Sequence, residues 1–123
     1  ETTPAGLRLT SAWAAADVGI ALDPAIIEAQ VRGAMIFGLS AAINGEVTFS
    51  EGQADQKNFW DYEPLRMNQC PTITVQILEY GGRIRGIGEP GTPPAAPALA
   101  NAIFALTGER IRSLPLKHAV DFA

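Results

Sequence analysis

The sequence predicts an α+β fold, namely a mixed sheet with two main helices. Two apolar segments, at 24–43 and 93–108, are bounded by residues that favour helix starts and stops. A third segment, at 72–80, alternates apolar and polar residues as a half-buried strand does. The elements follow one another without an internal repeat, so we expect residues 1–123 to form a single domain or a fragment of one.

Composition excludes several classes of protein. The hydrophobic content of 47% is enough for a modest core. The net charge of −4 and the lack of a Lys/Arg cluster argue against a nucleic-acid partner. Cys70 and His118 are the only cysteine and the only histidine, which excludes an internal disulfide, a thiolate zinc site and a multi-histidine metal site. The longest apolar stretch, from Met35 to Ile43, is shorter than the roughly 20 residues that cross a bilayer.

The first elements are an extended segment and a long helix. Residues 7–20 are predicted to be extended. Asp23 is a favourable N-cap, Pro24 suits the first helical position, and Asn44-Gly45 supplies a stop, so these residues delimit the helix 24–43.

This helix is apolar around most of its circumference, so we expect it to be buried on most sides. Gly33 and Gly38 inside it each cost about 1 kcal/mol relative to alanine. We therefore expect another group to approach the helix backbone closely at both glycines.

The middle of the chain is predicted to form strands. Residues 46–58 favour a hairpin that turns at Glu51-Gly52, and 60–71 are predicted to be an irregular link. In the strand 72–80 the apolar residues Ile73, Val75 and Ile77 point inward. We expect the hairpin and this strand to belong to one sheet.

A glycine- and proline-rich loop precedes the last helix and contains one carboxylate, Glu89. It is flanked by Gly86, Gly88, Pro90 and Gly91. Glycine permits backbone angles that other residues avoid, whereas proline fixes φ. A loop that combines the two can approach a bulky group closely and still hold the carboxylate in place.

These segments together resemble a known family. "GIGEPGTPPAAPALANAIFALTGERIRSLPL", "DVGIALDPAIIEAQVRGAMIFGLSAAINGEVTF" and "NFWDYEPLRMNQCPTITV" look like the C-terminal end of the molybdenum-binding subunit of the xanthine oxidase family. The branch they resemble is that of isoquinoline 1-oxidoreductase and aldehyde dehydrogenase. The resemblance runs from about Leu9 to Leu116 in the right order.

The resemblance implies roles for individual residues. Glu89, in the Gly-x-Gly-Glu-Pro loop, would be the general base, and Gly86 and Gly88 would let this loop approach the cofactor. Gln30 and Gly33, in a Gln-x-x-Gly pattern, would contact the pterin. Residues 58–66 resemble the wall of a substrate funnel. None of these residues is expected to ligate the metal. Arg83 and Arg85, just before the loop, depart from the family pattern and receive no role.

The resemblance also implies a function for the longer protein. It would be a bacterial molybdenum hydroxylase that oxidises an aldehyde or an N-heterocyclic small molecule, with water as the oxygen source. The cofactor would be molybdenum-molybdopterin in its cytosine dinucleotide form. The partners would be the remainder of the molybdenum-binding subunit, an iron–sulfur subunit with 2Fe–2S clusters and, as a candidate acceptor, a cytochrome c. The family favours a periplasmic or membrane-associated complex. We expect the 123-residue chain by itself to be inactive.

Other interpretations remain open from the residues alone. Glu89 could be an acid that stabilises a helix start, worth about 0.3–1 kcal/mol. Gln30 could satisfy a buried carbonyl. The whole chain could be a non-catalytic assembly piece that completes the fold of a partner subunit.

Overall fold

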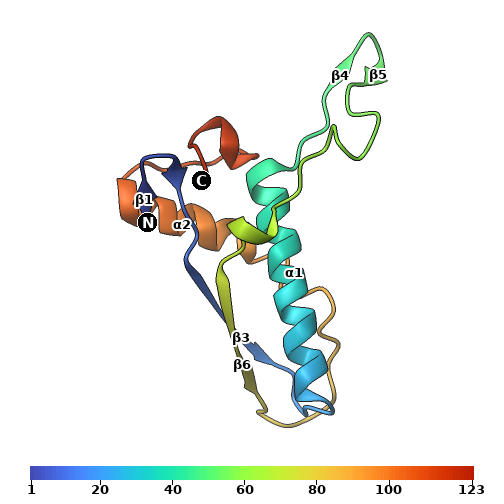
Figure 1. Ribbon diagram of the computed structural model, residues 1–123. Helices are drawn as coiled ribbons and strands as arrows, with labels where there is room; N and C mark the ends of the chain where they lie inside the picture. Colours follow the sequence, from blue (N-terminus) through green and yellow to red (C-terminus); the bar gives the residue numbers. More distant parts are fainter.

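The computed structural model describes all residues, 1–123, and contains two helices and three separate pairs of strands (Figure 1). The helices are α1 (Pro24–Asn44) and α2 (Ala95–Thr107), with short 3₁₀ turns η1 (Met67–Gln69) and η2 (Leu116–His118). The strands are β1 (Thr2–Thr3), β2 (Gly6–Leu7), β3 (Ser11–Asp17), β4 (Phe49–Ser50), β5 (Gln53–Ala54) and β6 (Thr72–Leu78). The predicted α+β class with two main helices is confirmed.

The start of α1 and the end of α2 lie where local capping chemistry predicts them. The Asp23 side chain accepts a hydrogen bond of 3.1 Å from the backbone N–H of Ile26 and so caps α1. Gly108 ends α2 in the left-handed conformation, with φ of 77°, which favours glycine. The predicted boundaries of α1 and α2 are therefore confirmed to within two residues.

α1 buries only one face, and the expectation that it is buried on most sides is wrong within this chain. The buried face consists of Ile27, Val31, Ala34, Gly38, Leu39, Ala42 and Ile43. On the other side, Ile26 and Phe37 are 59% and 70% exposed. The reason is that α2, β6, η2 and the residues before α2 cover a single face of the helix. By length and composition alone, α1 is also long and apolar enough to cross a membrane.

β3 and β6 form a parallel pair in a continuous register from Ser11↔Thr72 to Asp17↔Leu78. The connection between them includes α1, as parallel pairing requires a long crossover. Ile73 is buried and Val75 and Ile77 are half-buried, while Thr74 and Gln76 are exposed. The predicted alternation of this strand is confirmed.

The hairpin of β4 and β5 turns at Glu51-Gly52 as predicted, with positive φ angles of 52° and 78°. It does not share a sheet with β6, so that expectation is wrong. It projects away from the rest of the molecule (Figure 1), and its contacts are local, such as the 2.6 Å hydrogen bond from Thr48 Oγ1 to Asp55 Oδ2. β6 pairs with β3 instead, because a pairing partner is decided by tertiary contacts that strand alternation does not specify.

The core lies where α1 crosses α2 and is closed by the C-terminal segment. Its buried residues are Leu39, Ala42, Ile43, Ala95, Leu99, Ile103, Ile111 and Leu116. A Cβ at Gly38 would lie 2.6 Å from the carbonyl oxygen of Thr92 and 2.7 Å from the Ala95 Cβ. The predicted close approach is thus confirmed at Gly38. At Gly33 nothing in this chain lies within 4 Å of a Cβ.

Candidate functional site

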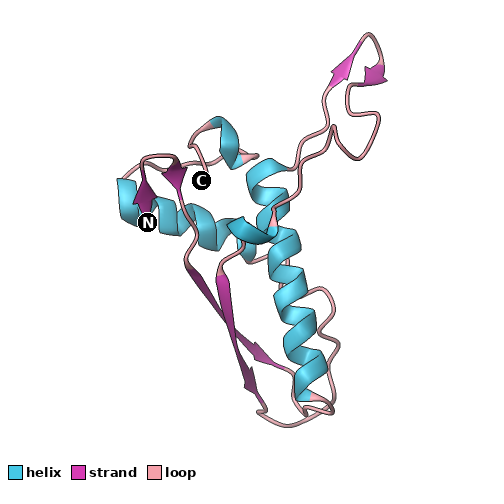
Figure 2. Cartoon of the chain, in the orientation of Figure 1, coloured by secondary structure: helices cyan, strands magenta, loops and turns pink.

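The loop that carries Glu89, residues 81–94, connects the β6 end of the molecule to α2 and runs as irregular backbone beside α1 (Figure 2). Thr92 anchors it, because its Oγ1 donates a 3.2 Å hydrogen bond to the backbone oxygen of Ala34 in α1. Gly91 is buried, and a Cβ there would lie 3.0 Å from the backbone oxygen of Val31. The second half of the loop is therefore fixed to the middle of α1.

The side chain of Glu89 is exposed and has no hydrogen-bond partner within the chain. Its backbone oxygen accepts a 2.9 Å hydrogen bond from Thr92 N–H, which closes a turn. α2 begins at Ala95, so Glu89 lies before the first turn of this helix. Glu89 thus precedes α2 by six residues, and both the general-base and the helix-start interpretations of its role stay predictions. The carboxylate is free to contact a group from outside the chain.

Gly86 and Gly88 face open space. A Cβ at either position would meet nothing within 4 Å, and neither residue has a positive φ. This chain therefore gives no internal reason for glycine at these two positions. Gly86 also lines a cavity of about 500 Å³ between β3, α1 and the start of α2.

Gln30 and Gly33 are both exposed on α1. Gln30 directly precedes Val31, whose backbone oxygen lies next to Gly91, but successive residues of a helix point about 100° apart, so this proximity in the sequence does not place the Gln30 amide against the loop. That amide has no hydrogen-bond partner in the chain, and the alternative that it satisfies a buried carbonyl is wrong within this chain. At 3.6 residues per turn, Gly33 lies farther around the helix, about 130° from the contact face. Gln30 and Gly33 are thus both exposed on α1, and their contact with a cofactor stays a prediction.

Asp17 was missed by the sequence analysis. Its Oδ1 accepts hydrogen bonds from the backbone N–H groups of Gly19 at 2.9 Å and Tyr80 at 3.3 Å. These bonds, with a smaller contribution from the charge of Arg85, hold the pKa of Asp17 below its ordinary value. Asp17 and Arg85 line the same cavity as Gly86. The available signal was a carboxylate at the carboxyl end of a parallel strand, where α/β sheets often bind ligands.

A second polar cluster lies at the C-terminal end of α1. His118 Nε2 is 2.9 Å from Glu46 Oε1, and Lys117 Nζ is 3.5 Å from Glu46 Oε2. The hydrogen bond with His118, and then the charges of His118 and Lys117, lower the pKa of Glu46. This cluster ties the start of the hairpin segment to η2 and is 30% to 60% exposed, so it is a surface ion pair and not a site.

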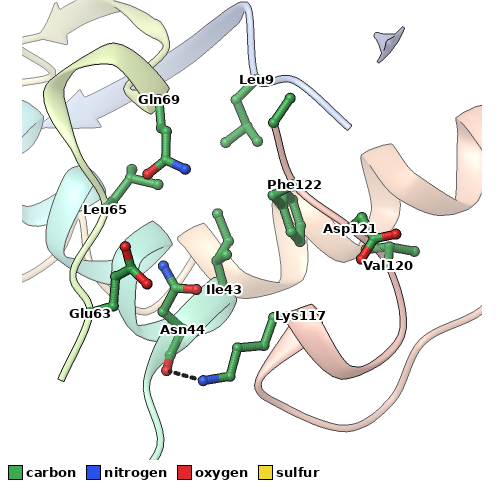
Figure 3. Close-up of a pocket in the computed structure, with 11 residues that line it drawn as sticks. Leu9, Ile43, Asn44, Glu63, Leu65, Gln69, Lys117, Val120, Asp121 and Phe122 are labelled. Atoms are coloured by element: carbon green, nitrogen blue, oxygen red, sulfur yellow. Dashed lines mark hydrogen bonds between the residues drawn. The ribbon is translucent and has the colours of Figure 1, made fainter. Parts of the chain in front are cut away.

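Lys117 of this cluster also lines a cavity of about 260 Å³, which Figure 3 shows. Glu63 and Leu65, from the segment that resembles a funnel wall, line it together with Ile43 and Lys117. Lys117 Nζ donates a 3.2 Å hydrogen bond to the backbone oxygen of Asn44. Ile43 lies twelve residues after Val31, and a helix rises about 1.5 Å per residue, or about 18 Å over this span. This cavity therefore lies far from the Glu89 loop and does not contain Glu89.

Comparison with known proteins identifies the fold. A family model described as a molybdopterin cofactor-binding domain matches residues 4–71, more than half of the chain. The chain belongs to this family. The resemblance to molybdenum-binding subunits of the xanthine oxidase family is thereby confirmed. The chain is 39% identical over 114 residues, or 93% of its length, to the beta subunit of isoquinoline 1-oxidoreductase from Brevundimonas diminuta.

A further curated protein and a solved structure are also similar to the chain. A membrane-bound aldehyde dehydrogenase of Gluconacetobacter polyoxogenes is 35% identical over 84% of the chain. The crystal structure of quinoline 2-oxidoreductase from Pseudomonas putida 86 superposes with a TM-score of 0.79 at 27% identity, over 89% of the chain. The chain spans only 15% of the length of the first relative, 13% of the second and 15% of this structure.

Gly33 offers a test of the cofactor face of α1. Because a Cβ at Gly33 meets nothing in the chain, we expect Gly33→Ala to stabilise the isolated chain by roughly 1 kcal/mol through helix propensity. Urea denaturation measures this gain. If the cofactor lies against Gly33 in the longer protein, the same substitution lowers the molybdenum content of that protein. An unchanged molybdenum content would remove Gly33 from the cofactor site.

Proposed function

We propose that this chain is the C-terminal part of the molybdenum-binding subunit of a molybdenum hydroxylase, and that it supplies the general base. The substrate of the whole enzyme would be an aldehyde or an N-heterocyclic compound, and water would supply the oxygen. The observation that supports this most directly is the Gly-x-Gly-Glu-Pro loop in a chain of this family. Its second half is fixed to α1, while the Glu89 side chain is exposed and unpartnered.

We propose that residues of this chain serve the molybdopterin cofactor, each with a defined task. The bound cofactor supplies the metal centre that transfers oxygen and accepts electrons. Glu89 would accept the proton of the attacking oxygen, as a general base within hydrogen-bond reach does. Gly86 and Gly88 would allow the loop to come close, and the Gln30 amide would hydrogen-bond to the pterin. The anchor at Gly91 and Thr92 would hold the carboxylate in position.

The same proposal includes the cofactor form and the partners. Relatives are named as one subunit of a larger enzyme, for example the nicotine 6-hydroxylase large subunit of Paenarthrobacter nicotinovorans and the xanthine dehydrogenase molybdenum-binding subunit of Escherichia coli. We therefore propose that the remainder of the molybdenum-binding subunit, a 2Fe–2S subunit and a cytochrome c acceptor complete the enzyme. The cofactor would be the cytosine dinucleotide form of molybdopterin. The chain alone, which spans 15% of the first relative, would bind no cofactor tightly.

Metal analysis of the longer protein tests the proposed function. We expect about one molybdenum per intact molybdenum-binding subunit and, with its iron–sulfur partner, oxidation of an aldehyde or N-heterocycle with incorporation of oxygen from labelled water. The purified 123-residue chain is the matched control and should contain no molybdenum. An intact subunit that assembles without molybdenum would favour the assembly interpretation of this chain. Stoichiometric molybdenum in the chain alone would contradict the expectation that the other cofactor-binding segments are needed.

A further inference from the structure

β3 has an unpaired edge. Thr72 N–H donates to the Thr10 oxygen and Val18 N–H donates to the Leu78 oxygen, at 3.0 and 3.1 Å. In a parallel pair, backbone groups alternate between the partner and the opposite edge. The backbone N–H and C=O groups of Ser11, Trp13 and Ala15 therefore point away from β6. No strand is paired with β3 on that side. A parallel sheet of only two strands with an open edge is unusual among stable folds.

A groove runs along this open edge. One cavity, of about 640 Å³, lies between residues 7–13 and α2, and the cavity of about 500 Å³ that contains Gly86 continues it along the rest of β3. The two share Trp13, Met35, Ala95 and Ala98 as lining residues. The residues that line the groove are mostly apolar. Many of them are alanines, which leave room for the side chains of another segment. Seven strand residues span about 23 Å, so the groove matches a strand in length as well as in chemistry.

The hairpin of β1 and β2 leads directly into the groove. Glu1 and Arg8 exchange backbone hydrogen bonds, Glu1 N to the Arg8 oxygen at 3.0 Å and Arg8 N to the Glu1 oxygen at 2.9 Å. Glu1 and Arg8 also line the groove at its β2 end. Continuing this antiparallel ladder beyond Glu1 would run the polypeptide alongside residues 9–17. The residues between Arg8 and Thr10 form no regular strand. A β-bulge at this place would shift the hydrogen-bond ladder by one residue, so that the added strand pairs with Ser11 and Trp13.

We propose that the groove holds an extended strand from the longer polypeptide, on the amino-terminal side of Glu1, paired antiparallel to β3. This inference rests on the proposed function in one respect, namely that the chain is part of a much longer subunit. The added strand would hydrogen-bond to Ser11, Trp13 and Ala15. Its inward side chains would be apolar, because they face Met35, Leu99 and the alanines of α2. The parallel pair of β3 and β6 would then be the interior of a larger mixed sheet.

Amide hydrogen exchange in the intact subunit tests this pairing. We expect the amides of Ser11, Trp13 and Ala15 to exchange at least about 100-fold more slowly than unstructured amides, with similar protection in the residues just before Glu1. The Ala12 and Ala14 amides, which belong to the ladder with β6, provide the reference within the same strand. Fast exchange at Ser11, Trp13 and Ala15, or no protection before Glu1, would overturn the proposal. Protection that appears only in a dimer would assign the edge to a second copy and overturn it as well.

A backbone variant gives an independent test. Ala15→Pro removes one N–H at the open edge and leaves the ladder with β6 intact, whereas Ala15→Ser keeps this N–H. We expect Ala15→Pro to lower the yield of folded intact subunit at least about tenfold relative to Ala15→Ser, because an interior strand does not tolerate proline. Equal yields would overturn the proposal. Molybdenum content separates the two hypotheses. Protected amides at the β3 edge without molybdenum would reject the proposed function and keep the added strand. Molybdenum with unprotected amides at this edge would reject the added strand and keep the proposed function.

Discussion

Replacing Glu89 by glutamine in the assembled enzyme should leave the molybdenum content unchanged and lower kcat by about 10²–10⁴-fold, the usual effect of removing a general base. Glutamine keeps the size and much of the hydrogen bonding of glutamate but accepts no proton at neutral pH. The Glu89 side chain is exposed and makes no hydrogen bond within this chain, so the substitution removes no contact that holds the fold together. A loss of this size corresponds to about 3–5 kcal/mol of transition-state stabilisation.

Steady-state kinetics on fully metallated protein measures this effect. Glu109→Gln is a matched control, because Glu109 is an exposed glutamate that lies beyond the end of α2 and lines none of the cavities described above. We expect this control to retain the kcat of the parent enzyme. Unchanged turnover in Glu89→Gln would remove Glu89 from the mechanism, even though the family of the chain is established.

Gly38→Ala should destabilise the chain by up to about 2 kcal/mol. The added Cβ would lie 2.6 Å from the Thr92 oxygen and 2.7 Å from the Ala95 Cβ, which are backbone and short side-chain atoms that cannot rotate away. Overpacking of this kind costs about 1–3 kcal/mol, or more when the surroundings are rigid, and the gain in helix propensity offsets about 1 kcal/mol. Chemical denaturation followed by far-UV circular dichroism measures the change.

Gly33→Ala is the natural comparison, because it makes the same substitution in the same helix at a position where nothing lies within 4 Å. Opposite signs for the two substitutions would show that Gly38 is required by the crossing of α1 over the residues before α2. If both variants gained stability, the close contact between α1 and Thr92 would be contradicted. Because Thr92 also anchors the Glu89 loop to Ala34, we expect Gly38→Ala to lower kcat in the assembled enzyme as well.

The sequence proposes Glu89 as the centre of the candidate site through the family resemblance of the Gly-x-Gly-Glu-Pro loop, because the local pattern alone leaves the role of this carboxylate open. The structure adds the anchor that sequence reasoning did not find, which is the contact of Gly91 and Thr92 with α1. It also adds Asp17 and Arg85 beside Gly86 in one cavity. Asp17 is far in the sequence from Arg85 and Gly86, and it is brought to them by the parallel pairing of β3 with β6 and by the 3.2 Å hydrogen bond from Arg85 N–H to the Val18 oxygen. The roles of Glu89, Gln30 and Gly33 stay predictions.

The sequence by itself determined the elements whose causes are local. Asp23 and Pro24 start α1, Gly108 ends α2, Glu51-Gly52 turn the hairpin, and alternation defines β6. Only the tertiary structure decided which faces and edges are covered. α1 is apolar nearly all round, yet a single face is buried, since burial depends on which other segments are near. In the same way β6 pairs with β3 and not with the hairpin, because strand alternation specifies a buried face but not a neighbour.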